Sequence, residues 1–156
     1  MSTTTTPGVT PGVTTPGDTP TGVTVLLTQL SRVVYRRTSE DLLGMRLKEF
    51  VMLALVRDHS PIPQQELGEV LCIDANNLVL LLNQLESRGF AYRRRDPTDR
   101  RRHLVEITEE GRAACERAEH GIESVEEDVL ASLSGPERSE LHALLVKALD
   151  GSPAPG

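Results

Sequence analysis

The fold is decided by residues 65–107, QELGEVLCIDANNLVLLLNQLESRGFAYRRRDPTDRRRHLVEI. Apolar residues at helical spacing predict one helix over 64–71 and a second helix that begins after Asp74 and runs to Arg88. Asp74 is a favourable N-cap, because its side chain can accept a hydrogen bond from a free backbone N–H of the first turn. Only residues 72–73 separate the two helices, so the sequence predicts a helix-turn-helix.

A β-hairpin is predicted directly after the second helix. Gly89 favours the left-handed conformation that ends helices. Short strands are expected over 91–95 and 102–107, joined by the turn-forming sequence DPTDRR at 96–101. A helix-turn-helix followed by a hairpin is a winged helix-turn-helix, in which the hairpin is the wing.

Further helices are expected on both sides of this unit. The apolar spacing predicts helices over 23–37 and 47–58 before it, and over 109–133 and 134–149 after it. The last of these begins with SGPE, which has the spacing of a capping box. The predicted fold class is therefore mainly α with a small β-hairpin wing, built from six helices and two strands.

The first 22 residues differ in composition from the rest of the chain. They are almost wholly Thr, Pro, Gly and Val, and they contain no Lys or Arg. Such a segment buries too little apolar surface to offset the entropy of ordering it, so we expect a disordered arm over 1–22. The chain shows neither the pattern of a secretory signal nor an apolar run of membrane-spanning length. A cytoplasmic protein is expected.

Charge is segregated along the chain. The net charge is −6, but residues 88–102 contain seven Arg and two Asp, a local charge of +5, and residues 106–150 carry −8. An acidic body with one basic segment can bind a polyanion through that segment. The arginines lie on both sides of a turn rather than along a helix face, which favours a phosphate-binding segment over solvated surface.

The second helix of the helix-turn-helix has an apolar face and a polar face. The apolar face is expected to pack on the preceding helix in a buried seam of Leu67, Val70, Leu71, Leu78, Leu81, Leu82 and Leu85. The polar face contains Asn76, Asn77, Leu80, Asn83, Gln84 and Ser87, with Val79 at its margin. Asn and Gln can read base edges in the major groove of DNA. Leu80 has two interpretations: contact with thymine methyl groups, or packing inside the protein on a rotated helix.

Three motifs resemble the MarR (multiple antibiotic resistance regulator) family of transcription regulators: DPTDRRRHLVEITEEGR at 96–112, LxxLExRGF at 82–90 and QELGE at 65–69. The resemblance implies a wing whose tip arginine enters the minor groove, held by an aspartate two residues earlier. Asp99 and Arg101 match that pair, with Arg100 between them. It also implies a homodimer built by N- and C-terminal helices. In many members, a small aromatic acid or phenol, or oxidation of a cysteine, releases the DNA.

The expected organisation is a domain over 23–150, with dimerisation helices at 23–46 and 109–150 around a winged helix-turn-helix at 47–108. The expected function is sequence-specific binding of double-stranded DNA by a homodimeric transcription regulator, a ligand-responsive repressor acting on a palindromic operator. A small aromatic or phenolic effector is the expected ligand. The candidate DNA-binding residues are Gln64, Asp74, Asn76, Asn77, Val79, Leu80, Asn83, Gln84, Arg94, Arg95, Asp99, Arg100 and Arg101.

Other functions match fewer features. A Gly-rich phosphate loop, HExxH and GxSxG are all absent, so neither an enzyme nor a cofactor is expected. His120 has Glu116 and Glu123 at metal-ligand spacing, but a solvated helix surface is the preferred interpretation. Cys72 and Cys115 are expected to be small core residues. The alternatives are a metal- or redox-sensing regulator, or a protein-interaction module that uses the basic wing.

Overall fold

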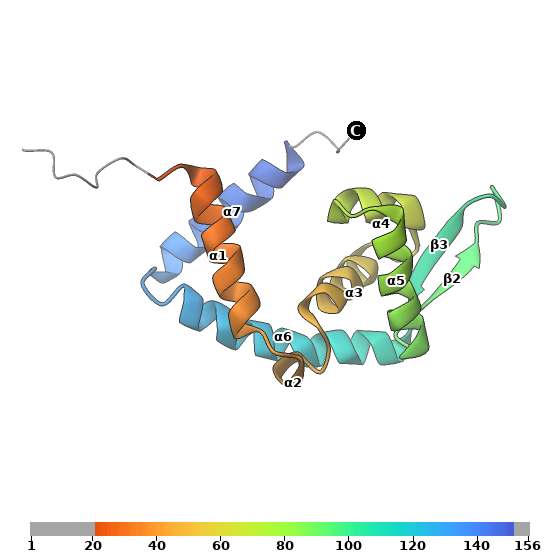
Figure 1. Ribbon diagram of the computed structural model, residues 1–156, viewed down its shortest axis with the longest axis horizontal. Helices are drawn as coiled ribbons and strands as arrows, with labels where there is room; N and C mark the ends of the chain where they lie inside the picture. The colour runs from red at the N-terminus through yellow and green to blue at the C-terminus, as the bar shows by residue number, and fades with distance from the viewer. Residues whose placement is uncertain (1–20, 152–156) are drawn as a thin grey trace, which may run out of the picture.

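The computed structural model describes residues 21–151, so the predicted arm at 1–22 lies almost wholly outside the described residues. The described chain is mainly helical with one small sheet (Figure 1), which confirms the predicted fold class. In chain order the elements are α1 (Val23–Arg37), α2 (Glu40–Leu43), α3 (Leu47–His59), β1 (Ile62–Pro63), α4 (Gln64–Leu71), α5 (Ala75–Ser87), β2 (Ala91–Arg95), β3 (His103–Ile107), α6 (Glu109–Val129) and α7 (Gly135–Asp150).

The wing is the antiparallel pair β2 and β3, and it belongs to a three-stranded sheet in the order β1-β3-β2. Val105 of β3 lies opposite Arg93 of β2 on one side and opposite Ile62 of β1 on the other. The sequence did not predict β1, because it has only two residues and one of them, Pro63, argues against a strand. At the edge of a sheet a proline is tolerated, since its missing N–H is not needed there.

One cluster of buried side chains joins α3 to the helix-turn-helix and the sheet. Its completely buried members include Met52, Leu53 and Val56 of α3, Leu67 of α4, Leu82 and Leu85 of α5, and Val105 of β3. Burial of each such side chain contributes about 1.5–3 kcal/mol, so the core holds α5 and the wing in a fixed relation. The placement of Val70 in the buried seam is wrong: it is 55% exposed. The short helix α4 packs on the core through the side that contains Leu67 and Gly68, and Val70 is not on that side.

Helix α6 packs closely through small residues. A Cβ on Gly111 would lie 2.0 Å from the carbonyl oxygen of Phe90, and one on Gly121 would lie 2.9 Å from a methyl carbon of Leu43. The first contact fixes the start of α6 beside the wing, and the second fixes its middle beside α2. Short side chains are thus required where α6 meets these neighbours.

One additional helix and one shorter helix differ from the predictions. Helix α2 was not predicted, because its four residues make a single turn and carry no periodic pattern; Ser39 caps it by accepting a hydrogen bond from the N–H of Leu42 (3.1 Å). Helix α6 ends at Val129 rather than at residue 133. Residues 130–133 form a turn that leads to Ser134, whose side chain caps α7 as the capping-box spacing predicted.

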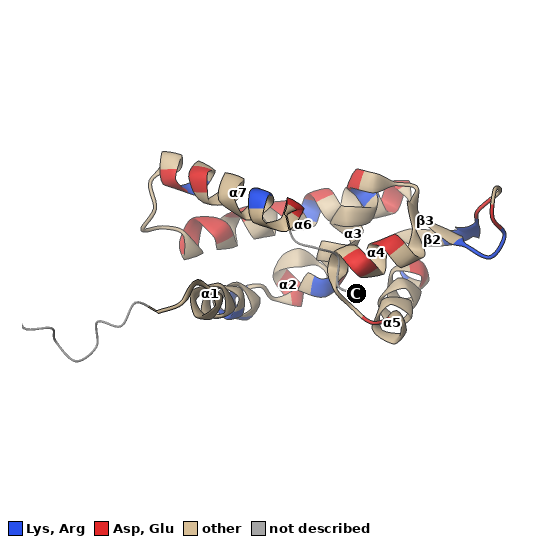
Figure 2. Ribbon diagram, turned by 90° about the horizontal axis from the view of Figure 1, so that it is seen from above, with Lys and Arg blue, Asp and Glu red and all other residues tan. Residues whose placement is uncertain are grey.

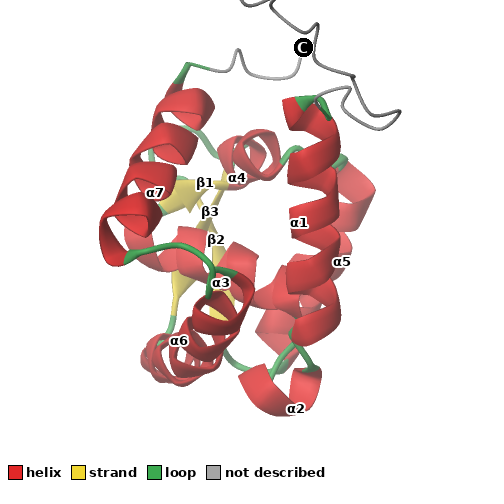
Figure 3. Ribbon diagram, turned by 90° about the vertical axis from the view of Figure 1, so that its left-hand side faces the viewer, coloured by secondary structure: helices red, strands yellow, loops and turns green. Residues whose placement is uncertain are grey.

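The winged unit and the terminal helices lie at opposite ends of the molecule. The wing projects from one end, α1 and α7 lie at the other, and α6 runs between them (Figure 1). Seen from the end that carries α1 and α7, these two helices stand apart, one on each side of the view (Figure 3). No helix within 21–151 combines the length and apolar character that a membrane span needs.

Candidate nucleic-acid interface

The helix-turn-helix is built as predicted, with α4 and α5 joined by a tight turn. Cys72 ends α4 with φ 52°, and the N–H of Ile73 donates to the carbonyl of Gly68 (3.1 Å). Gly68 allows the two helices to approach, because a Cβ there would lie 3.0 Å from a methyl carbon of Leu78. The turn therefore fixes the direction of α5 relative to α4.

The two cysteines differ in their surroundings. The prediction that Cys72 is a core residue is wrong: it is exposed, because the left-handed turn places it on the surface. Cys115 is buried in α6, as predicted, and burial raises the pKa of its thiol. A buried thiol with a raised pKa is poorly reactive.

Asp74 caps α5 in the predicted manner. Its Oδ1 accepts hydrogen bonds from the N–H groups of Asn76 (3.0 Å) and Asn77 (2.9 Å). Its Oδ2 accepts a hydrogen bond from the Nδ2 of Asn77 (2.5 Å). These bonds, those from Asn77 foremost, hold the pKa of Asp74 below its ordinary value. Asp74 is thus committed to the helix, and it orients one of the candidate base readers.

The outward face of α5 has the predicted composition. Asn76, Asn77 and Asn83 are exposed, whereas Gln84 and Val79 are partly buried. Leu80 is 58% exposed, so the interpretation in which it packs inside the protein on a rotated helix is wrong. A large apolar side chain that stays in water beside three amides can contact an apolar group of a ligand, such as a thymine methyl.

The wing tip presents arginines on a structured turn. Asp96 is buried, and its Oδ1 accepts hydrogen bonds from the N–H (2.8 Å) and the hydroxyl (2.7 Å) of Thr98, which lower its pKa. Asp99 accepts hydrogen bonds from the backbone N–H of Arg101 (3.0 Å) and from its Nε (3.3 Å). The predicted Asp99–Arg101 pair is therefore formed. Arg100, between them, is exposed.

Arg94 and Arg95 lie on the wing strand β2 but play different roles. Arg94 forms an ion pair with Glu106 of β3, whose carboxylate also accepts a hydrogen bond from the hydroxyl of Tyr92 (2.6 Å). Both contacts lower the pKa of Glu106, and its charge offsets that of Arg94. Arg95 donates to the carbonyl oxygen of Arg100 (2.9 Å), which links the strand to the tip.

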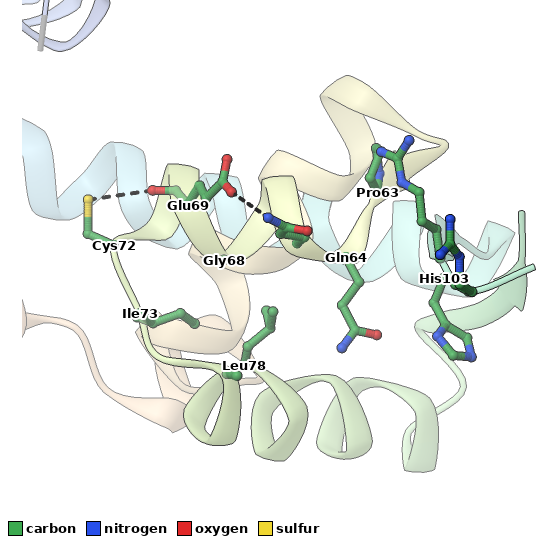
Figure 4. Close-up of a pocket in the computed structure, with 12 residues that line it drawn as sticks. Pro63, Gln64, Gly68, Glu69, Cys72, Ile73, Leu78 and His103 are labelled. Atoms are coloured by element: carbon green, nitrogen blue, oxygen red, sulfur yellow. Dashed lines mark hydrogen bonds between the residues drawn. The ribbon is translucent and has the colours of Figure 1, made fainter. Parts of the chain in front are cut away.

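A groove of about 560 Å³ lies between α4, α5 and the wing. Gln64 points into it from α4, Cys72 lies at one end and His103 of the wing at the other (Figure 4). Arg101 and Arg102 also line it. Gln64 was predicted from the sequence as a DNA-binding residue, whereas Arg102 and His103 were not, although Arg102 ends the basic segment 88–102 and His103 follows it.

Two arginines of the basic segment 88–102 that were not in the predicted set bind acidic residues of neighbouring elements. Arg88, at the end of α5, donates to the carbonyl oxygen of Gly44 (2.6 Å) and to the buried carboxylate of Glu49 (3.4 Å). Arg93 of β2 binds Glu86 of α5. The charge pattern alone could not separate these structural arginines from the exposed arginines at 100–102 of the wing tip, which Figure 2 colours blue.

The described residues contain no group of three or more His, Cys, Asp and Glu side chains that could hold a metal ion. His120 lies 3.6 Å from Glu123 on the exposed surface of α6, in agreement with the solvated-surface interpretation.

The chain is similar to known proteins in sequence and in structure. The sequence profile of the MarR family matches residues 45–103. The transcriptional regulator HosA of Escherichia coli O111:H- is 31% identical over 123 residues, which are 79% of this chain and 90% of HosA. The HTH-type transcriptional repressor NicR of Pseudomonas putida is 32% identical over 102 residues, so the chain spans about two thirds (65%) of that relative. A crystal structure of an E. coli MarR mutant complexed with operator DNA superposes with a TM-score of 0.65 at 26% identity, covering 81% of this chain and 90% of that one.

Proposed function

This chain belongs to the MarR family, and from that premise we propose that it is a transcription regulator that binds duplex DNA sequence-specifically. One observation carries the proposal: the exposed amides of α5 and the arginines of the wing tip lie together at one end of the molecule (Figures 1 and 2). A helix of this kind enters the major groove by its N-terminal residues. We expect Arg101, on the wing beside it, to enter the neighbouring minor groove, where negative potential attracts arginine.

The charge distribution supports the same orientation on DNA. Figure 2 shows blue arginines gathered at the wing, with red only at its two aspartates, whereas α6 and α7 carry many acidic residues. The wing would be attracted to phosphates, and the acidic helices would be repelled by them. The segregation thus favours a complex in which the wing faces the duplex and the terminal helices face away.

The terminal helices support a homodimer. Within the described chain, neither α1 nor α7 has a buried residue. Val23 of α1 is 72% exposed and Leu149 of α7 is 75% exposed. A second copy of the chain would bury these apolar faces around a two-fold axis. Such a dimer presents two copies of α5 about 34 Å apart, the repeat of a palindromic site.

A cavity supports control of DNA binding by a small effector. It has a volume of about 500 Å³ and lies between α1, α3 and α5. Arg46 and Lys48 offer positive charge, Tyr35 and Val51 offer an aromatic and an apolar surface, and Leu80 of α5 closes another side. This chemistry suits a small aromatic acid or phenol. Since α5 forms part of the wall, a bound effector would act directly on the DNA-reading helix. We therefore propose a cytoplasmic repressor that releases DNA when the effector binds.

The direct test is a selection of bound sequences from a random duplex pool, followed by fluorescence anisotropy at several salt concentrations. The proposal predicts a palindromic consensus and an affinity that falls steeply as salt increases, because bound counterions are released. Asn77→Ala is expected to relax the base preference at one position of each half-site, whereas Ser139→Ala on α7 leaves it unchanged. Absence of any enriched sequence, together with binding to acidic proteins, would favour the protein-interaction alternative.

The effector is tested on the selected duplex with a panel of hydroxylated benzoates. We expect at least one member to lower DNA affinity, and Lys48→Met to weaken that response. Lys147→Met, which removes a lysine of α7 outside the cavity, is the matched control. If no benzoate changes DNA affinity in the wild-type protein, the proposed aromatic-acid effector is wrong.

A further inference from the structure

Arg93 joins the wing to the DNA-reading helix through a dense set of hydrogen bonds. Its Nε donates to Oε1 of Glu86 (3.0 Å), and its Nη2 donates to Oε2 of Glu86 (2.6 Å). Its backbone N–H also donates to Oε1 of Glu86 (2.9 Å). A two-point pair of this kind is both stronger and more directional than a single contact.

The pair is partly sheltered from water. The side chains of Arg93 and Glu86 are 22% and 29% exposed, and the hydrogen bond from Arg93 lowers the pKa of Glu86. The guanidinium therefore has one fixed place against α5. The second N–H of its Nη2 group is fixed with it.

This second N–H of Arg93 donates to Asn83. The Nη2 of Arg93 also donates to Oδ1 of Asn83 (2.6 Å). Asn83 lies one turn before Glu86 on α5, so a single guanidinium reaches both side chains. Because the amide oxygen is held toward Arg93, the Nδ2 group of Asn83 is turned away from it.

Asn77 is held in the opposite sense. Its Nδ2 donates to Oδ2 of Asp74 (2.5 Å), which leaves its oxygen directed away from Asp74. An adenine is read by an asparagine that offers its oxygen and its N–H together. Asn83 offers chiefly N–H, a group that matches the keto oxygens of guanine and thymine in the major groove.

We infer that Arg93 is a positioning residue that makes Asn83 a hydrogen-bond donor toward DNA, and so sets a preference for guanine or thymine at one position of each half-site. The inference rests on the proposed function, since it takes α5 to be the DNA-reading helix. It adds a specificity role for Arg93, which does not itself touch the base. The wing thereby determines how a residue of α5 reads sequence.

The test compares the sequences selected from a random duplex pool by the wild-type protein and four variants. Asn83→Ala identifies the base position that Asn83 reads, because the wild-type base preference is lost at that position. Asn83→Asp, which still accepts from Arg93 but has no N–H, is expected to lose the same preference. Arg93→Met frees the amide of Asn83, and we expect adenine to become favoured at that position by roughly tenfold over the wild-type profile.

Glu86→Gln separates the positioning of Asn83 from wing docking, which is the attachment of the wing to α5 through the Arg93–Glu86 ion pair. It removes the ion pair with Arg93 but leaves the Arg93–Asn83 hydrogen bond available, so we expect the base profile to stay as in the wild type. Thermal unfolding of each variant shows whether it is folded, and Asn83→Ala tests the donor role with both Arg93 and Glu86 retained.

The outcomes distinguish a failure of the proposed function from a failure of the proposed role of Arg93. If the wild-type protein selects no sequence, the proposed function fails. If it selects one and the Arg93→Met and wild-type profiles agree, or if Asn83→Asp keeps the guanine or thymine preference, only the role of Arg93 is overturned. An equal change of profile in Glu86→Gln and Arg93→Met would also overturn it, since wing docking alone would then explain the effect.

Discussion

Replacement of Arg101 by alanine is expected to weaken DNA binding and leave the fold unchanged. The Arg101 side chain is 92% exposed, and its ion pair with Asp99 (3.3 Å) lies at the surface. It is not among the residues that pack in the core. Loss of the side chain should therefore not alter the midpoint of thermal unfolding.

The size of the binding defect follows from the removal of one guanidinium from each wing. One arginine that contacts DNA contributes about 1–3 kcal/mol, which is roughly a 5- to 150-fold change in the dissociation constant for each wing. Asp99 contacts Arg101 only at the surface, so the cost of ordering the side chain on DNA is part of this measured difference. If the arginine meets a phosphate, the slope of log affinity against log salt also decreases by about 1 for each wing.

Fluorescence anisotropy with the selected duplex, at fixed salt and over a salt series, measures both quantities. Arg117→Ala is the matched control, because Arg117 is an exposed arginine of α6 that lies outside the wing. A variant Arg101→Ala that binds as tightly as the wild type would refute the role of the wing tip. Equal losses in Arg101→Ala and Arg117→Ala would show that net charge alone, and not the wing, determines affinity.

Three further predictions concern folding, assembly and pH. Gly111→Ala places a Cβ 2.0 Å from the carbonyl oxygen of Phe90; we expect a loss of about 3 kcal/mol or more in free energy of unfolding by urea denaturation, against little change for Gly135→Ala, whose Cβ has no neighbour within 4 Å. The double variant Leu144→Asp/Leu149→Asp should sediment as a monomer, whereas Val70→Asp on α4 should not; a dimeric double variant would contradict the assembly. The pKa of Glu86 is lowered by Arg93, so the pair stabilises the fold above the ordinary carboxyl pKa and loses this effect as pH falls through the lowered one. Arg93→Met should therefore show a smaller loss of stability between about pH 5 and pH 3, and a loss equal to that of the wild type would mean that this pair does not contribute.

Local chemistry explains which parts of the fold could be predicted. Asp74, Gly89 and Ser134 act through hydrogen bonds or backbone angles within a few residues, so their positions identify helix ends directly. The wing strands follow from the turn sequence between them in the same way. The two-residue strand β1 depends instead on pairing with Val105, which is distant in sequence. No local pattern could reveal it.

Side-chain burial was harder to predict than secondary structure. Val70 and Cys72 have apolar character, but the exposed side of α4 and the left-handed turn place them in water. Leu80 could not be assigned from the sequence, because helical spacing leaves the rotation of α5 open until α3 packs against it. The sequence also could not show which wing arginines form ion pairs. Only the positions of Glu86, Glu106 and Asp99 in the structure identify their arginine partners.

The central claim is that the wing enters the minor groove while α5 occupies the major groove beside it. Cleavage mapping tests this most directly: Arg100→Cys, in a Cys72→Ser background so that the other exposed thiol is absent, is labelled with an iron chelate that cuts nearby DNA. Two clusters of cuts should flank the palindrome, with the offset toward the 3′ ends of the strands that marks cleavage from the minor groove. Cuts with the opposite, major-groove offset, or cuts spread evenly along a duplex that the labelled protein binds specifically, would contradict the account.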